Sequence, residues 1–75
     1  MNMEKIKKII AEHFNVGAET LSPETDLVKE LHADSLDLVE LIMAFEEEFG
    51  LTIPDDVAMS VKKISDISDY LEKAN

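Results

Sequence analysis

The sequence predicts an all-α fold, a four-helix bundle with one short third helix and a long loop after the first helix. Apolar residues recur at helical spacing along most of the chain, and no segment alternates between apolar and polar residues as a half-buried strand does. A length of 75 residues suits one small domain, so residues 1–75 are assigned to a single domain.

The first helix is expected from Met3 to about Phe14, because apolar residues recur there with helical periodicity. Asn2 can cap its start, and Asn15-Val16-Gly17 can end it. The apolar residues of this helix are Met3, Ile6, Ile9, Ile10 and Phe14.

Residues 15–34 are expected to form a long connection, punctuated by Gly17, Ser22 and Pro23. Loops of this length are uncommon in compact domains. Its apolar residues indicate that it packs on the core, and Asp26 to Leu31 can form one helical turn. These apolar residues are Val16, Leu21, Leu27, Val28 and Leu31.

The second helix is predicted from Ser35 to about Phe49, with a wide apolar face. Asp34 is its predicted N-cap, with Asp37 three residues further on. Gly50 suits the position just after its C-terminus. The apolar face comprises Leu38, Val39, Leu41, Ile42, Phe45 and Phe49.

The chain beyond Gly50 is expected to contain two further helices. Leu51 to Pro54 should be extended, as the residue before a proline prefers to be. A short third helix is expected from about Asp55 to Ser60, and a last helix from about Ser65 to Lys73. The inward-facing residues of the last helix are Ile64, Ile67 and Leu71.

Charge and composition exclude several classes of partner. Seven lysines and 17 acidic residues give a net charge of −10, which opposes binding to nucleic acid and stable association with anionic membranes. This charge favours protein partners with basic patches. The longest apolar run, Leu41 to Phe45, is too short to span a membrane. The absence of Cys excludes disulfides and suits a reducing cytoplasm, where we expect the protein.

No dedicated metal site is expected from the sequence. An EF-hand loop requires alternating Asp or Asn, a central Gly and a terminal Glu. Neither Asp34 to Asp37 nor Asp55-Asp56 fits this template. We therefore expect only weak, non-specific binding of divalent cations to clustered carboxylates.

Catalysis is not expected, although Ser35 has His32 three residues before it and Asp34 beside it. The G-x-S-x-G elbow of serine hydrolases is absent, and a bundle of this size offers no cleft that excludes water. His32 and His13 are interpreted as surface or half-buried residues. The chain is therefore not expected to be an enzyme.

Ser35 is instead a candidate for covalent modification. It begins the second helix, where free N–H groups and the positive end of the helix dipole favour an anion such as a phosphate ester. Asp34 and Asp37 would repel that phosphate but could hold a metal ion that belongs to a modifying enzyme. Serine is also favoured at helix starts for structural reasons, so the residues alone leave both interpretations open.

Leu31 to Leu41, with the sequence LHADSLDLVEL, resembles the attachment motif of acyl carrier proteins. Phe45 to Phe49, Ile53-Pro54-Asp55 and Ile67 to Leu71 are also similar to that family's pattern, in order and over nearly the whole chain. The chain thus resembles a single, bacterial-type acyl carrier domain of fatty-acid synthesis.

This resemblance implies that 4′-phosphopantetheine is attached to Ser35 and that its thiol holds growing acyl chains as thioesters. It implies that Asp34 supports the metal ion of a phosphopantetheinyl transferase, the holo-acyl-carrier-protein synthase. The protein, expected to be a monomer, would present its acyl cargo to enzymes of fatty-acid synthesis and catalyse no reaction itself.

A stripe along the second helix is the expected partner surface. Its members are spaced by four, three and four residues, share one helix face and match the family's partner positions. They are Leu36, Glu40, Met43 and Glu47, flanked by Asp37, Ala44 and Glu48. A charge run is usually only a solvated face. The apolar Leu36 and Met43 among these charges favour a binding surface instead.

The sequence departs from the family's pattern at three places. His32 stands where the family usually has Gly, Leu38 replaces a smaller polar residue, and residues 57–59 make the third helix less acidic. Partner preference therefore stays open. The alternatives are a carrier for polyketide, peptidyl or D-alanyl transfer, and an unmodified acidic adaptor that binds a basic protein.

An acyl chain sheltered in the core would be lined by Leu38, Val39, Ile42, Val61 and Ile67.

Overall fold

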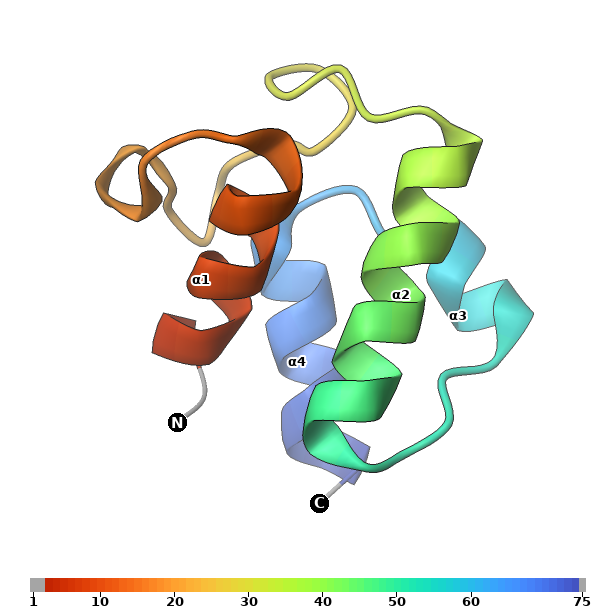
Figure 1. Ribbon diagram of the computed structural model, residues 1–75. Helices are drawn as coiled ribbons and strands as arrows, with labels where there is room; N and C mark the ends of the chain where they lie inside the picture. Colours follow the sequence, from red (N-terminus) through yellow and green to blue (C-terminus); the bar gives the residue numbers. More distant parts are fainter. Residues whose placement is uncertain (1–2, 75) are drawn as a thin grey trace.

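Four α-helices and one 3₁₀ helix form the protein over residues 3–74, the part that the computed structural model describes. They are α1 (Met3–Phe14), η1 (Ala18–Thr20), α2 (Ser35–Phe49), α3 (Asp55–Ser60) and α4 (Ile64–Ala74). The three longer helices stand side by side, and the short α3 flanks α2 (Figure 1). No strand occurs in residues 3–74, so the predicted all-α fold with a short third helix is confirmed.

The predicted bounds of the first three α-helices are confirmed, and α4 begins one residue earlier and ends one later than expected. The predicted turn at residues 26–31 is also present, because the Glu30 N–H donates to the Asp26 carbonyl at 2.9 Å. The sequence did not predict η1. The expected cap at Asn2 lies outside the described residues. Within those residues, no helix has the length and apolar character that crossing a membrane requires.

Left-handed residues end the first two α-helices. Asn15 (φ 56°) follows α1 and Gly50 (φ 65°) follows α2, in the conformation that ends many helices. The Gly50 N–H donates to the Glu46 carbonyl at 2.9 Å, and the Val16 N–H to the Ala11 carbonyl at 3.0 Å. Both predicted helix ends are therefore confirmed.

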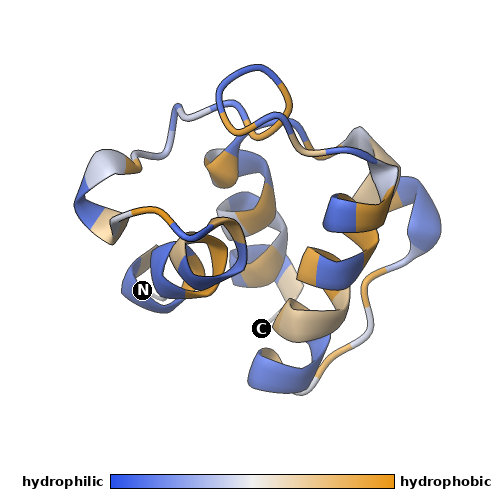
Figure 2. Cartoon of the chain, turned by 45° about the horizontal axis from the view of Figure 1, so that its top comes forward, coloured by the Kyte–Doolittle hydropathy of each residue, from blue (hydrophilic) through white to orange (hydrophobic). Residues whose placement is uncertain are grey.

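The hydrophobic core lies between α1, α2 and α4, whose apolar stripes face one another (Figure 2). The largest fully buried side chains are Phe45, Ile6, Ile10, Leu27, Leu41, Ile64 and Leu71. The prediction that Val39 belongs to the buried face of α2 is wrong, since this residue is 52% exposed. At 3.6 residues per turn it lies about 100° from the middle of that face, at its edge.

The long connection between α1 and α2 packs on the core through part of its apolar residues. Leu21 and Leu27 are buried, and Leu31 is half-buried. The expectation is wrong for Val16 and Val28, which are exposed. Val28 follows Leu27 in a tight turn, so the burial of Leu27 directs its neighbour outward.

Backbone hydrogen bonds tie this loop to the start of α4. The Leu27 N–H donates to the Lys62 carbonyl at 2.7 Å, and the Ile64 N–H donates to the Thr25 carbonyl at 3.1 Å. These bonds satisfy polar groups that burial would otherwise leave unpaired. A connection without extended secondary structure thus has a fixed path toward α2.

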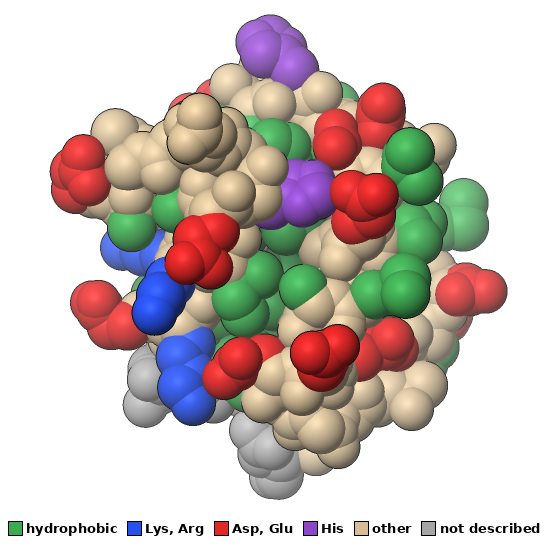
Figure 3. All heavy atoms as spheres, in the orientation of Figure 1, with side chains coloured by type: hydrophobic (Ala, Val, Ile, Leu, Met, Phe, Trp, Pro, Cys, Tyr) green, Lys and Arg blue, Asp and Glu red, His purple; other side chains and the backbone are tan. Residues whose placement is uncertain are grey.

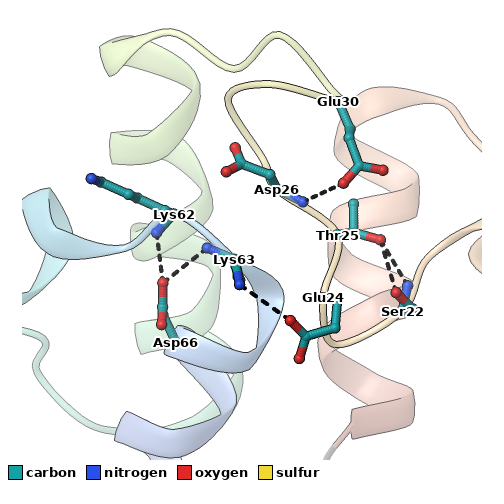
Figure 4. A network of polar contacts seen from close by, with 8 residues as sticks. All are labelled: Ser22, Glu24, Thr25, Asp26, Glu30, Lys62, Lys63 and Asp66. Atoms are coloured by element: carbon teal, nitrogen blue, oxygen red, sulfur yellow. Dashed lines mark hydrogen bonds and ion pairs between the residues drawn. The ribbon is translucent and has the colours of Figure 1, made fainter.

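Side chains complete the same junction (Figure 4). Oδ2 of Asp66 accepts the backbone N–H groups of Lys62 and Lys63, each at 2.9 Å. The N–H of Lys63 and then that of Lys62 lower the pKa of Asp66, because they stabilise its ionised form. The ammonium of Lys63 also reaches Glu24 in the loop at 3.2 Å.

Candidate functional site

Ser35 is exposed and is the first residue of α2, where the long loop enters the helix (Figure 1). The chain is anchored just before it, because Ala33 is buried and its N–H donates to the Leu27 carbonyl at 3.0 Å. An exposed hydroxyl therefore stands on a fixed backbone position.

A capping box forms the start of α2. Oδ1 of Asp34 accepts the Asp37 N–H at 2.8 Å, and Oδ2 of Asp37 accepts the Asp34 N–H at 3.1 Å. The predicted N-cap is confirmed. The N–H groups of Ser35 and Leu36 are among those that a helix start leaves without an intrahelical acceptor. A phosphate ester on Ser35 would meet these donors and the positive end of the helix dipole.

The end of α1 contacts this first turn of α2 through His13. Its Nε2 lies 3.2 Å from Oδ1 of Asp37 and 3.7 Å from Oε1 of Glu40. The backbone N–H of Asp34 lowers the pKa of Asp37, and the hydrogen bond with His13 lowers it further. Asp37 is therefore held ionised in the first turn of α2, two residues after Ser35. The interpretation of both histidines as surface or half-buried residues is confirmed, since His13 is half-buried and His32 is exposed.

His32 has a left-handed backbone with φ 58°. Glycine adopts this region without strain, whereas a residue with a Cβ does so at a cost. This position therefore favours glycine, the residue that the resemblance described above implies here. His32 is tolerated at the exposed end of the loop, three residues before Ser35.

The expected partner surface faces solvent. Leu36 and Met43 are 63% and 61% exposed, and Glu40 and Glu47 are exposed beside them. Figure 3 shows acidic side chains spread over the face that carries α2, with hydrophobic side chains between them. Of the flanking acids, Asp37 is half-buried against His13, and Glu48 lies 3.6 Å from the ammonium of Lys5.

Two exposed apolar residues were not assigned to this surface from the sequence. Val39 adds to the exposed apolar side chains of α2, and Met59 on α3 is 83% exposed. The helical phase of Val39 places it at the edge of the apolar face but does not tell whether that edge is covered. Met59 carried no such signal, because α3 has only six residues.

An apolar seam runs between α2, α3 and α4. It is lined by Ile42, Ile53, Val57, Val61, Ile67 and Tyr70 and contains no void large enough for a water molecule. Of the lining that was expected for a sheltered acyl chain, this seam includes Ile42, Val61 and Ile67. It does not include Leu38 or Val39, so that part of the expectation is wrong. An acyl chain could enter only if these helices separated.

Comparison with known proteins identifies the class to which this fold and site belong. A family model described as a phosphopantetheine attachment site matches residues 4–71. The match and the all-helical fold define a carrier domain with 4′-phosphopantetheine as its cofactor.

Proteins of similar sequence and structure narrow this class of carrier domain to one family. The acyl carrier protein AcpP of Rhizobium meliloti is 51% identical over 71 residues, which cover 95% of this chain and 91% of that protein. An acyl carrier protein of Nitratidesulfovibrio vulgaris is 54% identical over 68 residues, 91% of this chain and 90% of its own. A solved structure assigned as an acyl carrier protein from Mycobacterium tuberculosis superposes with a TM-score of 0.90 at 26% identity, and both chains are covered completely. The chain belongs to the acyl carrier protein family.

Proposed function

We propose that Ser35 carries the 4′-phosphopantetheine arm and that the arm presents acyl chains, held as thioesters, to enzymes of fatty-acid synthesis. The observation that carries this proposal is the exposed position of Ser35 at the first residue of α2, inside the region that matches the attachment-site family. A hydroxyl in this place is open to a modifying enzyme and close to N–H donors that suit a phosphodiester.

Asp34 has two roles in this proposal. Its Oδ1 caps α2 through the 2.8 Å bond from the Asp37 N–H. Its exposed carboxylate also supports the metal ion of the phosphopantetheinyl transferase, next to the serine that is modified. A fixed carboxylate beside the hydroxyl can orient such an ion without any rearrangement of the helix start.

The α2 stripe is the proposed docking surface for the transferase and for the synthesis enzymes. Exposed Glu40 and Glu47 would meet Lys or Arg, while Leu36 and Met43 supply the apolar contacts. Asp37, which contacts His13, would contribute mainly to the field around Ser35, whereas Glu48, which contacts Lys5, would add negative charge at the other end of α2.

The proposal also covers the domain organisation, the oligomeric state and the location of the protein. Residues 1–75 act as one carrier domain, a monomer that catalyses no reaction itself and works in the cytoplasm. The lack of Cys supports that location, and the single core to which all four α-helices contribute supports the single domain.

Loading with coenzyme A tests the attachment site. Incubation with coenzyme A, Mg²⁺ and a phosphopantetheinyl transferase is expected to add one arm to the wild type. Ser35→Ala should remain unloaded, whereas Ser60→Ala, which removes another exposed hydroxyl, should load like the wild type. Intact-mass spectrometry distinguishes the forms. Loading of Ser35→Ala would show that another residue carries the arm, and failure of the wild type to load would favour the unmodified adaptor.

A further inference from the structure

The contact between α1 and α2 brings together three potential metal ligands. His13 lies in the last turn of α1, and Asp37 and Glu40 lie one turn apart near the start of α2. One ligand atom from each residue lies within 4.8 Å of the others. The imidazole Nε2 is 3.2 Å from the Asp37 carboxylate and 3.7 Å from that of Glu40.

These separations are close to those between the ligand atoms around a bound metal ion. Zinc binds nitrogen and oxygen ligands at about 2.0–2.2 Å with tetrahedral geometry, which separates the ligand atoms by roughly 3.3 Å. The two measured separations from Nε2 lie on either side of that value. Small rotations of the exposed Glu40 side chain would bring its oxygen into the coordination sphere.

Two of the ligands are held in place before any ion arrives. The Asp34 N–H donates to Oδ2 of Asp37 at 3.1 Å, so Oδ1 is the oxygen turned toward His13. The His13 side chain is only 22% exposed, and its ring packs edge-on against Phe14 with centroids 4.9 Å apart. His13 also borders an open groove of about 420 Å³ between α1 and α2, through which a hydrated ion can approach.

We propose that His13, Asp37 and Glu40 bind a single Zn²⁺ ion, or a divalent transition metal of similar preference, which links the end of α1 to the start of α2. Two carboxylates and a neutral imidazole match the mixed nitrogen and oxygen ligands of zinc sites with an open position for water. The imidazole also separates this site from calcium and magnesium sites, which are built from oxygen ligands.

This proposal departs from the expectation that no dedicated metal site exists. That expectation depended on ligand spacing along the chain, and His13 is 24 residues from Asp37. The site does not depend on the attachment of an arm to Ser35. An ion bound here would neutralise part of the net charge of −10 and stabilise the packing of α1 on α2.

The test uses the full chain without metal and titrates it with Zn²⁺, and in parallel with Ca²⁺, in a calorimeter. Wild type should bind one Zn²⁺. His13→Gln and Glu40→Gln should each lose at least ~10-fold in zinc affinity, as expected when a metal site is disturbed, with little change in calcium binding. His32→Gln is the matched control, because it removes the chain's other histidine, and should bind zinc like the wild type.

The visible absorption of bound Co²⁺ gives a second measurement, because it depends on the ligands around the ion. Co²⁺ in the wild type and in His32→Gln should show the visible absorption of a four- or five-coordinate ion, which His13→Gln should lack. Circular dichroism checks that each variant is helical. If His13→Gln does not fold, Glu40→Gln, which changes an exposed side chain, replaces it as the test variant. The proposal is overturned if zinc affinity stays within twofold in both His13→Gln and Glu40→Gln, or if His32→Gln loses it equally.

Discussion

Substitutions of Asp34 separate its role as a helix cap from its proposed role in attachment. In the structure its side chain accepts the Asp37 N–H at 2.8 Å, and its own N–H is bound in return by the Asp37 carboxylate. Asn at this position can accept the same hydrogen bond but carries no charge. Ala can do neither, so the pair Asp34→Asn and Asp34→Ala tests one role at a time.

The expected magnitudes differ for the two variants. Loss of a cap costs about 1 kcal/mol, and in a domain of this size about 1 kcal/mol lowers the melting temperature by roughly 4–8 °C. Asp34→Ala should show this decrease, whereas Asp34→Asn should stay within about 0.5 kcal/mol of the wild type. If the carboxylate supports the transferase's metal ion, both variants should load about 10- to 100-fold more slowly, the loss typical of a residue that supports a metal site.

Calorimetry and loading kinetics measured on the same preparations decide the question. Equal stability losses in the Asn and Ala variants would contradict the capping role that the hydrogen bonds define. Wild-type loading rates in Asp34→Asn would show that the charge of Asp34 plays no part in attachment. Slow loading in Asp34→Ala alone would assign the effect to a disordered helix start rather than to the metal ion.

Three further predictions concern the loop, the docking surface and the pH dependence. His32→Gly should raise stability by about 0.5 kcal/mol, because relief of the left-handed strain exceeds the entropy that glycine adds to the unfolded chain; a fall in the melting temperature would contradict this. Glu40→Lys combined with Glu47→Lys should slow loading with the arm and weaken the salt dependence of the loading rate, while the helix content stays the same. Unchanged loading rates would show that the α2 stripe is only a solvated face. Asp37 has a lowered pKa in the folded state, so its stabilising effect is present above its ordinary pKa of 3.8 and is lost as the pH falls through the folded value. The difference in melting temperature between wild type and Asp37→Asn should therefore shrink in acid, and a difference independent of pH would refute this linkage.

Much of the fold could be predicted because its signals are local. The bounds of α2 follow from the cap at Asp34, the apolar periodicity and the left-handed Gly50, which are all adjacent to the helix they define. Val39 was misassigned because a helical pattern gives the phase of a face but not its width. The structure supplies that width, because it shows that the helices packed on α2 leave Val39 exposed.

The site could be predicted only in part. Ser35 and its acidic neighbours are contiguous, so both the helix start and the family motif indicate them. The contact between His13 and Asp37 joins residues 24 apart, and only the packing of α1 on α2 brings them together. The left-handed backbone of His32 is likewise set by the path of the loop, which depends on its hydrogen bonds with the start of α4.

The most direct test of the carrier role is transfer of an acyl group through the arm. The loaded protein should accept one acyl group that neutral hydroxylamine releases, as it does a thioester, and should pass that group to a condensing enzyme of fatty-acid synthesis. Ser35→Ala should accept none. Equal acylation of wild type and Ser35→Ala, or a loaded wild type that takes up no acyl group, would contradict the proposed function.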